Sequence, residues 1–296
     1  MANRSGIGGP AGRKWKRHMK LGYLGPAGTY SEEAAYKYSP EAEMVAFASI
    51  PTVVNAVEKR EIDQCVVPIE NSLHGAITDV LDFLVRSDEI MIAGELAVPI
   101  DHCLMVKPGT KIADLTVVYS HPQSLGQSRI YLGTALGHTQ AVASLSNAQA
   151  VIDMQESDAV AGAIGPRRAA DIYGAEVVAE AIQDNPNNYT RFVVLDDKDR
   201  SPTGHDMTSV AFQFSEDEPG LLYKALGVLT ENSINMVKIE SRPTGERLGR
   251  YTFMIDMELH RMDPVGRETI ERLREMSSWF KVLGSYPRME ELPIRG

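Results

Sequence analysis

Two short polar strings stand out in the sequence. Asn-Tyr-Thr-Arg-Phe at residues 188–192 opens an apolar run that continues to Leu195. It sets a hydroxyl (Thr190) beside a permanently charged guanidinium (Arg191), which are both strong hydrogen-bond donors. Glu-Ser-Arg-Pro at 240–243 lies in a segment of very different pattern. The two strings together suggest a catalytic module followed by a regulatory one.

A glycine-rich turn after the first apolar run could bind an anion. Residues 25–31 read Gly-Pro-Ala-Gly-Thr-Tyr-Ser and lead into a helical pattern. Thr29 and Ser31 lie where the unpaired N–H groups of a helix start favour a carboxylate. The spacing matches neither a dinucleotide fingerprint nor a phosphate-binding P-loop. A capped turn without any ligand is the alternative.

Two further apolar runs end in polar residues. Residues 67–75 deliver Glu70 and Asn71 to a helix start, where Asn71 or Ser72 could act as a cap and the carboxylate and amide could bind a hydroxylated substrate. Residues 120–127 follow the next such run. Ser120 and Gln127 could share a pocket if the chain turns back through a helix, and His121 invites a general-base role. However, no catalytic triad order supports nucleophilic catalysis, and a lone histidine beside a turn is usually structural.

The four strings before the linker all lie at the ends of apolar runs; they are residues 25–31, 67–75, 120–127 and 188–192. In open α/β sheets, ligands bind in the crevice beyond the strand ends. We therefore expect the strings to meet at one site. No pair of His, Cys or carboxylate residues has metal-ligand spacing, and no nicotinamide or pyridoxal signature is present. The sequence thus predicts chemistry without a metal or cofactor.

Composition limits the class of protein. A chain of 296 residues with a net charge of −10 has no concentrated basic face for nucleic acid. Cys65 and Cys103 lie in apolar runs, which is typical of buried free thiols in a cytoplasmic protein. Residues 1–19 are basic and lack an apolar core, so we expect a disordered leader, neither a secretory signal nor a membrane span. A basic tail that binds a membrane or nucleic acid is the alternative.

The elements that must position these strings alternate along the chain. From Leu21 to Leu195, apolar runs alternate with helical patterns, which favours an α/β fold. Thr29 and Ser146 each precede a helical pattern in a capping box, and Pro166 with Gly174 brackets a third helix. Residues 197–206 read as a linker. Residues 207–290 follow a βαββαβ order, which predicts a small ferredoxin-like sandwich.

Read in order, GPAGTYS, VPIENSLHG, SHPQSLGQ and NYTRF resemble the motif series of monofunctional prephenate dehydratases, and ESRP is similar to a motif of their ACT regulatory domain. The resemblance covers the chain from about Leu21 to its end. It implies a catalytic domain at 20–196 with two α/β lobes similar to type II periplasmic binding proteins. The lobes would comprise 20–99 with 180–196, and 100–179, followed by the ACT domain at 207–290.

The resemblance also implies a reaction and roles for residues. The family removes water and carbon dioxide from prephenate to give phenylpyruvate, on the way to phenylalanine, and aromatisation drives the reaction without a cofactor. Thr190 would donate a hydrogen bond to the leaving hydroxyl, Arg191 would bind a carboxylate, and Glu70 would supply the proton. Asn71, Ser120 and Gln127 would orient the substrate, and the remaining substrate-binding positions would be Thr29, Ser31, Ser72, Asn188 and Phe192.

In the ACT domain, the resemblance implies that L-phenylalanine binds at a subunit interface, so a homodimer or homotetramer is expected. The effector-binding positions would be Pro219, Gly220, Leu221, Leu222, Asn235, Glu240, Ser241 and Arg242. The usual Gly-Ala-Leu-Val is here Gly220, Leu221, Leu222, Tyr223, so the strength and direction of regulation stay open. Alternatively, Glu240 and Arg242 merely pair on the domain surface.

Two rival functions fit the same motifs. An arogenate dehydratase shares the fold and acts on the amino-acid analogue of prephenate. A non-catalytic amino-acid sensor could combine a two-lobed binding fold with an ACT domain. The joint presence of six residues disfavours the sensor, because binding alone would not require the whole set: Thr190, Arg191, Glu70, Asn71, Ser120 and Gln127.

Overall fold

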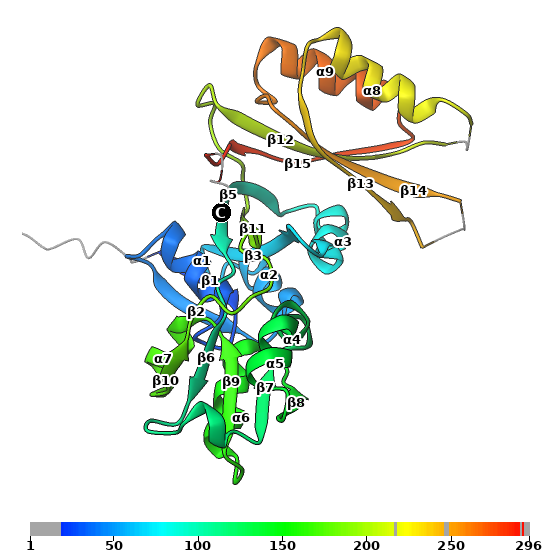
Figure 1. The fold of residues 1–296 in the computed structure, drawn as a ribbon. Helices are drawn as coiled ribbons and strands as arrows, with labels where there is room; N and C mark the ends of the chain where they lie inside the picture. The colour runs from blue at the N-terminus through cyan, green and yellow to red at the C-terminus, as the bar shows by residue number, and fades with distance from the viewer. Residues whose placement is uncertain (1–18, 216–217, 246–248, 291, 293–296) are drawn as a thin grey trace, which may run out of the picture.

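The computed structural model describes residues 19–215, 218–245, 249–290 and 292, and places them in three sheets with flanking helices (Figure 1). The expected basic leader at 1–19 lies almost entirely outside these residues. Both cysteines, Cys65 and Cys103, are buried and free. No helix in the described part of the chain is long and apolar enough to cross a membrane.

Lobe 1 contains the strand that carries Thr190. Its sheet has the order β2-β1-β3-β11-β5, with β4 paired to β3. The strands are β1 (Lys20–Leu24), β2 (Glu43–Phe47), β3 (Gln64–Asn71), β4 (Gly75–Ala76), β5 (Met91–Pro99) and β11 (Tyr189–Asp196). The helices are α1 (Tyr30–Tyr38), α2 (Ile50–Glu58) and α3 (Thr78–Arg86). Strand β11 runs antiparallel between β3 and β5, so it returns to lobe 1 after the chain has built lobe 2.

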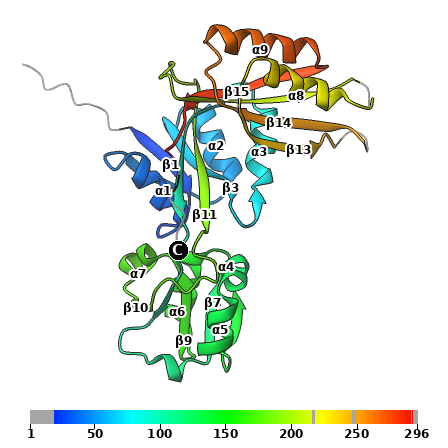
Figure 2. The same ribbon diagram turned by 45° about the horizontal axis from the view of Figure 1, so that its top comes forward.

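Lobe 2 is the segment inserted between β5 and β11. Its sheet has the order β10-β6-β9-β7-β8. The strands are β6 (Cys103–Val106), β7 (Val117–Ser120), β8 (Gln140–Ala143), β9 (Ala161–Gly165) and β10 (Glu176–Ala179). The helices are the short 3-10 helix η1 (Ile112–Asp114), α4 (Pro122–Gln127), α5 (Arg129–Ala135), α6 (Asn147–Glu156) and α7 (Arg167–Tyr173). Figure 2 shows this lobe below lobe 1, joined to it where the chain crosses.

The third unit has the predicted βαββαβ order. Its elements are β12 (Asp206–Gln213), α8 (Leu221–Glu231), β13 (Met236–Pro243), β14 (Tyr251–Met257), α9 (Pro264–Glu275) and β15 (Trp279–Pro287), with the sheet order β13-β14-β12-β15. Both helices cover one face of the sheet, and the other face turns toward lobe 1 (Figure 1). Met254, Leu283 and Tyr286 on that face share a buried core with Val193 and Leu195 of β11.

Local sequence signals place the helix starts near the site. The Thr29 side chain accepts a hydrogen bond from Glu32 N, and Ser146 accepts one from Gln149 N, so both predicted N-caps are confirmed. Gly174 ends α7 with a left-handed φ of 67°, as its predicted place after the helix requires. The predicted fold class, α/β with a ferredoxin-like C-terminal unit, is confirmed.

Candidate active site

A cleft of about 760 Å³ separates lobe 1 from lobe 2. All four sequence strings contribute to its walls, because their polar residues lie at the strand ends and helix starts that face it. The predicted site residues that line it are Thr29, Ser31, Asn71, Gln127, Thr190 and Phe192. The prediction that the strings meet at one crevice therefore agrees with the geometry.

Thr190 lies on β11 directly opposite Asn71 on β3. Asn71 Nδ2 donates a hydrogen bond to Thr190 Oγ1 at 3.0 Å. Because the threonine oxygen accepts this bond, its own proton stays available for an acceptor in the cleft. Thr190 is only 9% exposed, so that donor is held in a site with little competing water.

Asn71 is itself held in one orientation. Its side-chain Oδ1 accepts hydrogen bonds from the backbone N–H groups of Leu73 and His74, at 3.1 and 3.2 Å. Its Nδ2 also donates to Asn188 Oδ1 at 2.9 Å. Asn188 is fully buried and does not line the cleft, so the structure places it behind Asn71, not against a substrate.

Capped helices from both lobes begin at the cleft. Helix α1 of lobe 1 starts at Tyr30, and helix α6 of lobe 2 starts at Asn147. The short helix α4 of lobe 2 also starts there, with His121 as its N-cap. The first-turn N–H groups of a helix have no partner within the helix, and they carry the positive end of its dipole. No Lys or Arg side chain is among the described residues lining the cleft. Negative charge there would therefore be stabilised mainly by backbone N–H groups.

A buried histidine in the cleft wall joins the two lobes. His102 Nδ1 lies 2.9 Å from the hydroxyl of Tyr30 in lobe 1, and Nε2 lies 2.9 Å from Gln127 Oε1 in lobe 2. Burial lowers the pKa of His102, although the Gln127 hydrogen bond and Asp101 oppose that shift. A neutral His102 can thus fix the Gln127 amide, whose nitrogen lies 3.2 Å from His74 Nδ1.

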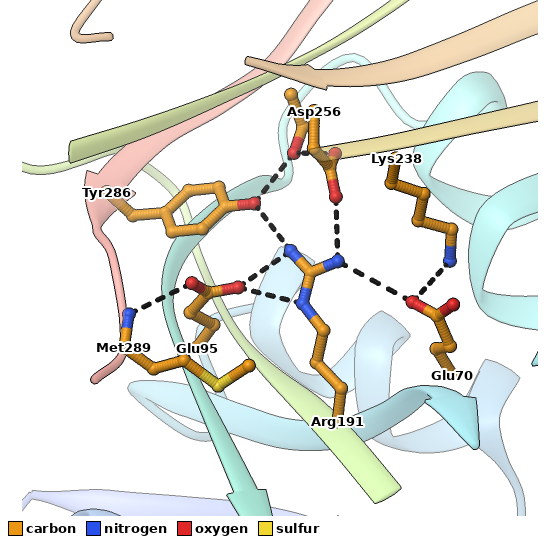
Figure 3. Close-up of polar contacts among 8 residues, drawn as sticks. Glu70, Glu95, Arg191, Lys238, Asp256, Tyr286 and Met289 are labelled. Carbon is orange, nitrogen blue, oxygen red and sulfur yellow. Dashed lines mark hydrogen bonds and ion pairs between the residues drawn. The ribbon is translucent and has the colours of Figure 1, made fainter. Parts of the chain in front are cut away.

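Arg191 and Glu70 do not reach the cleft. Successive residues of a strand point to opposite faces of the sheet, so Arg191 points away from Thr190, and Glu70 away from Asn71. Figure 3 shows the Arg191 guanidinium among Glu95, Asp256 and Tyr286. Arg191 Nε lies 2.8 Å from Glu95 Oε2, and Nη1 lies 2.7 Å from Asp256 Oδ2. Direct binding of a substrate carboxylate by Arg191, and proton donation by Glu70, do not fit this geometry.

Two other predicted residues lie beside the cleft. Ser120 is fully buried at the end of β7, where its hydroxyl lies 2.8 Å from Ile164 O and 3.3 Å from Asn147 Oδ1. Asn147 lines the cleft, so Ser120 supports it from behind. Ser72 Oγ donates to Asn187 O at 3.1 Å outside the cleft. The expected direct contact of Ser120 and Ser72 with a substrate is therefore not seen.

Several cleft residues were not predicted from the sequence. They are Tyr30, His74, His102, Ser124 and Asn147. A signal existed for Asn147, because it directly follows the predicted N-cap Ser146. Burial and partners of His102 arise only when the two lobes come together, so no local pattern indicates them.

The predicted effector residues separate into two groups within one chain. Gly220, Leu221 and Leu222 line a hollow of about 330 Å³ in the C-terminal unit, together with Phe214, Glu218, Tyr223, Gly249, Arg250, Tyr251 and Phe253. Pro219 precedes this group, and Gly220 adopts a left-handed φ of 89° at the start of α8. Asn235 precedes β13, and Glu240, Ser241 and Arg242 lie on it, away from this hollow. Arg242 Nη2 contacts Asp82 Oδ2 of α3 at 3.1 Å.

Comparison with known proteins agrees with the two-part architecture. The prephenate dehydratase family model matches residues 21–200, and the ACT domain model matches residues 209–275. A bifunctional chorismate mutase/prephenate dehydratase of Neisseria gonorrhoeae is 38% identical over 274 residues, which are 92% of this chain and 75% of that protein. Arogenate dehydratase/prephenate dehydratase 2 of Arabidopsis thaliana is 38% identical over 91% of this chain and 73% of its own length.

A solved structure resembles the whole molecule. The crystal structure of prephenate dehydratase from Arthrobacter aurescens in complex with L-Phe superposes with a TM-score of 0.85 at 32% sequence identity. The match covers 91% of this chain and 90% of that one. Family models and relatives agree over both the two-lobed part and the C-terminal unit, so this chain belongs to the prephenate dehydratase family and carries a C-terminal ACT domain.

Proposed function

We propose that this protein converts prephenate to phenylpyruvate in the cleft between the two lobes, in the cytoplasm, on the route to L-phenylalanine. The observation that carries the proposal is the Asn71–Thr190 pair, which points a threonine hydroxyl into a cleft where helices α1 and α6 begin. This arrangement can bind an anion and donate a hydrogen bond to a leaving oxygen, as the reaction requires.

The two carboxylates of prephenate suit the starts of helices α1 and α6. The N–H groups at Tyr30 and Ser31 on α1 would bind one carboxylate, and those at Asn147 and Ala148 on α6 would bind the other. The hydroxyl of Thr29 already donates to Leu24 O and accepts from Glu32 N, so its contribution is to cap the helix, leaving substrate contact to the backbone. A substrate spanning both lobes would also hold the cleft closed.

The chemical step needs few groups because the ring becomes aromatic. The bond between the ring and its carboxylate breaks, carbon dioxide leaves, and the electron pair enters the ring as the carbon–oxygen bond to the hydroxyl breaks. The departing oxygen takes up one proton and leaves as water. A threonine hydroxyl is too weak an acid to give up its proton outright, so Thr190 stabilises the developing charge while the net proton comes from solvent.

Arogenate is the second candidate substrate. It is favoured by relatives such as the Arabidopsis protein, which is named for both activities and is 38% identical to this chain. Arogenate differs from prephenate by an ammonium group in place of a keto group. The described residues lining the cleft include no Asp or Glu side chain, which favours the keto substrate.

Regulation by L-phenylalanine belongs to the same proposal. The Arthrobacter aurescens structure contains L-Phe, and its chain matches this one over the ACT domain as well. Gly220 and Leu221 would form one side of the effector site, and Glu240 to Arg242 of a second copy would form the other. This arrangement calls for a homodimer or homotetramer and explains why the two groups lie apart in one chain.

The test is an assay of the purified protein with prephenate, following phenylpyruvate by its ultraviolet absorbance, in parallel with arogenate and with and without L-phenylalanine. We expect phenylpyruvate to form and the rate to respond to phenylalanine. Turnover of arogenate alone would move the protein to the sister activity. Turnover of neither would refute the enzyme and leave the amino-acid sensor.

A further inference from the structure

Two dipeptides of lobe 1 each present one residue to the cleft and one to the ACT domain. In the antiparallel ladder of β3 and β11, Thr190 pairs with Asn71 and Arg191 pairs with Glu70. The first pair faces the cleft and is joined by the hydrogen bond of 3.0 Å. The second pair faces the opposite way, with Arg191 Nη1 lying 3.8 Å from Glu70 Oε2. A displacement of the outer pair that moves the backbone of β3 or β11 therefore also moves the inner pair, because the residues are bonded neighbours.

The outer pair is tied to the ACT sheet. Lys238 Nζ of β13 lies 2.8 Å from Glu70 Oε2, and Asp256 Oδ2 of β14 lies 2.7 Å from Arg191 Nη1. Tyr286 Oη of β15 lies 3.2 Å from Arg191 Nη2. Side chains from three strands of the ACT sheet thus contact Glu70 on β3 and Arg191 on β11 (Figure 3).

Most of these side chains are buried. Those of Arg191, Asp256 and Lys238 are 11%, 12% and 13% exposed, whereas that of Glu70 is 34% exposed. Asp256 is fixed from behind by Ser209, which donates to its Oδ1 at 2.6 Å. Solvent screens buried ion pairs such as Arg191–Asp256 little, and removing one partner leaves an uncompensated charge. The ties can therefore transmit displacement from the ACT sheet to β3 and β11.

Another ion pair crosses between the same two units without touching these strands. Arg242, on the same strand as Lys238, contacts Asp82 on α3 at 3.1 Å. The side chains of Arg242 and Asp82 are 28% and 40% exposed, and α3 carries neither Asn71 nor Thr190. This pair provides an internal control, because it joins the same two units but is not attached to the catalytic strands.

We propose that Lys238 and Asp256 of the ACT domain are positioning residues that act through Glu70 and Arg191 on the Asn71–Thr190 pair, so that this cluster couples the ACT domain to turnover. The inference rests on the proposed function. It assigns Arg191 and Glu70 a mechanical task, in contrast to the direct substrate contact predicted from the sequence. Because coupling is a difference in free energy between two states, removing a tie should weaken the effect of phenylalanine on turnover.

The experiment uses the full-length protein and four variants: Asp256→Asn, Lys238→Met, Lys238→Arg and the control Asp82→Asn. For each we would measure kcat and KM for prephenate across phenylalanine concentrations, and amide hydrogen exchange of β3 and β11. Phenylalanine changes kcat/KM by some factor in the wild type. In Asp256→Asn and Lys238→Met we expect that factor to be smaller by about fivefold or more, which is the lower end of common allosteric couplings. We also expect faster exchange in β11. KM should stay within about twofold of the wild type, since the helix starts proposed to bind the substrate carboxylates are unchanged.

Lys238→Arg should keep the response, because the cation is kept. Asp82→Asn should show wild-type exchange of β3 and β11. Its phenylalanine response is left out of the comparison, because its partner Arg242 belongs to the proposed effector site. Wild-type response and exchange in both Asp256→Asn and Lys238→Met would overturn the inference, as would equally fast β11 exchange in Asp82→Asn. If the wild type turns over prephenate but does not respond to phenylalanine, the proposed regulation fails. Faster β11 exchange in Asp256→Asn and Lys238→Met would then still support the link between the ACT sheet and β11, and wild-type exchange would overturn it. A wild type without any dehydratase activity would overturn both proposals.

Discussion

Replacing Thr190 with valine tests the central contact of the cleft. Valine has nearly the same shape, so the change removes the hydroxyl and little else. Asn71 Nδ2 keeps its bonds to Asn188 Oδ1 and Tyr189 O, so the stability cost should be about 1 kcal/mol, as for one hydrogen bond. The loss of a preorganised donor to a developing negative charge should lower kcat by about 100- to 1000-fold, or about 2.7 to 4 kcal/mol.

The assay compares kcat and KM of Thr190→Val with those of the wild type, and uses Thr116→Val as the matched control. Thr116 is exposed outside the cleft, where its hydroxyl lies 3.3 Å from Val160 O. The control should keep wild-type kcat. Thermal unfolding of both variants shows whether the fold survives. A Thr190→Val protein that is folded and keeps more than about a tenth of wild-type kcat would remove Thr190 from the chemical step.

Three more outcomes follow from the same geometry. Asn71→Asp keeps the acceptor for Leu73 N but cannot donate to Thr190, whose proton would turn to the new carboxylate; kcat should fall about tenfold or more, and unchanged kcat would contradict the bond direction in the structure. Burial lowers the pKa of His102 below its usual value of 6.5, so as pH falls the unfolded state binds the proton first. The free energy of unfolding should therefore decrease as pH falls below about 6.5. Urea midpoints should decrease less over this range in His102→Gln than in the wild type. Gly28→Ala should raise KM severalfold, because Gly28 has φ +85° and a Cβ there would lie 3.0 Å from Ala169 Cα of lobe 2; an unchanged KM in a steady-state assay would show that this contact does not set lobe closure.

The sequence indicated much of the architecture because its signals were local. Caps at Thr29 and Ser146, the proline and glycine around α7, and the βαββαβ order all act over a few residues. Polar strings at the ends of apolar runs also indicated the cleft. The ends of neighbouring strands meet at one edge of a sheet, so Asn71, Gln127 and Thr190 came together as predicted.

Side-chain direction was the main failure, and its cause is the period of a strand. Thr190 and Arg191 were both assigned to the substrate, but adjacent residues of β11 must face opposite sides of the sheet. The same rule separates Glu70 from Asn71 on β3. Once both segments are recognised as strands, alternation alone predicts that one residue of each pair leaves the cleft. Which residue of each pair faces the cleft depends on which face of the sheet packs against the ACT domain, and no local pattern shows that packing.

Arg191 also shows how a kinetic result could be misread. Its substitution would leave Glu95 and Asp256 buried without their cation, and β11 would shift to relieve the repulsion. Turnover would then fall although Arg191 does not line the cleft. Replacing a residue that binds a substrate carboxylate and replacing one that positions Thr190 would therefore both lower kcat/KM. Only the first replacement must also weaken ground-state binding of the substrate. The division of the effect between KM and kcat, not its size, separates the two roles.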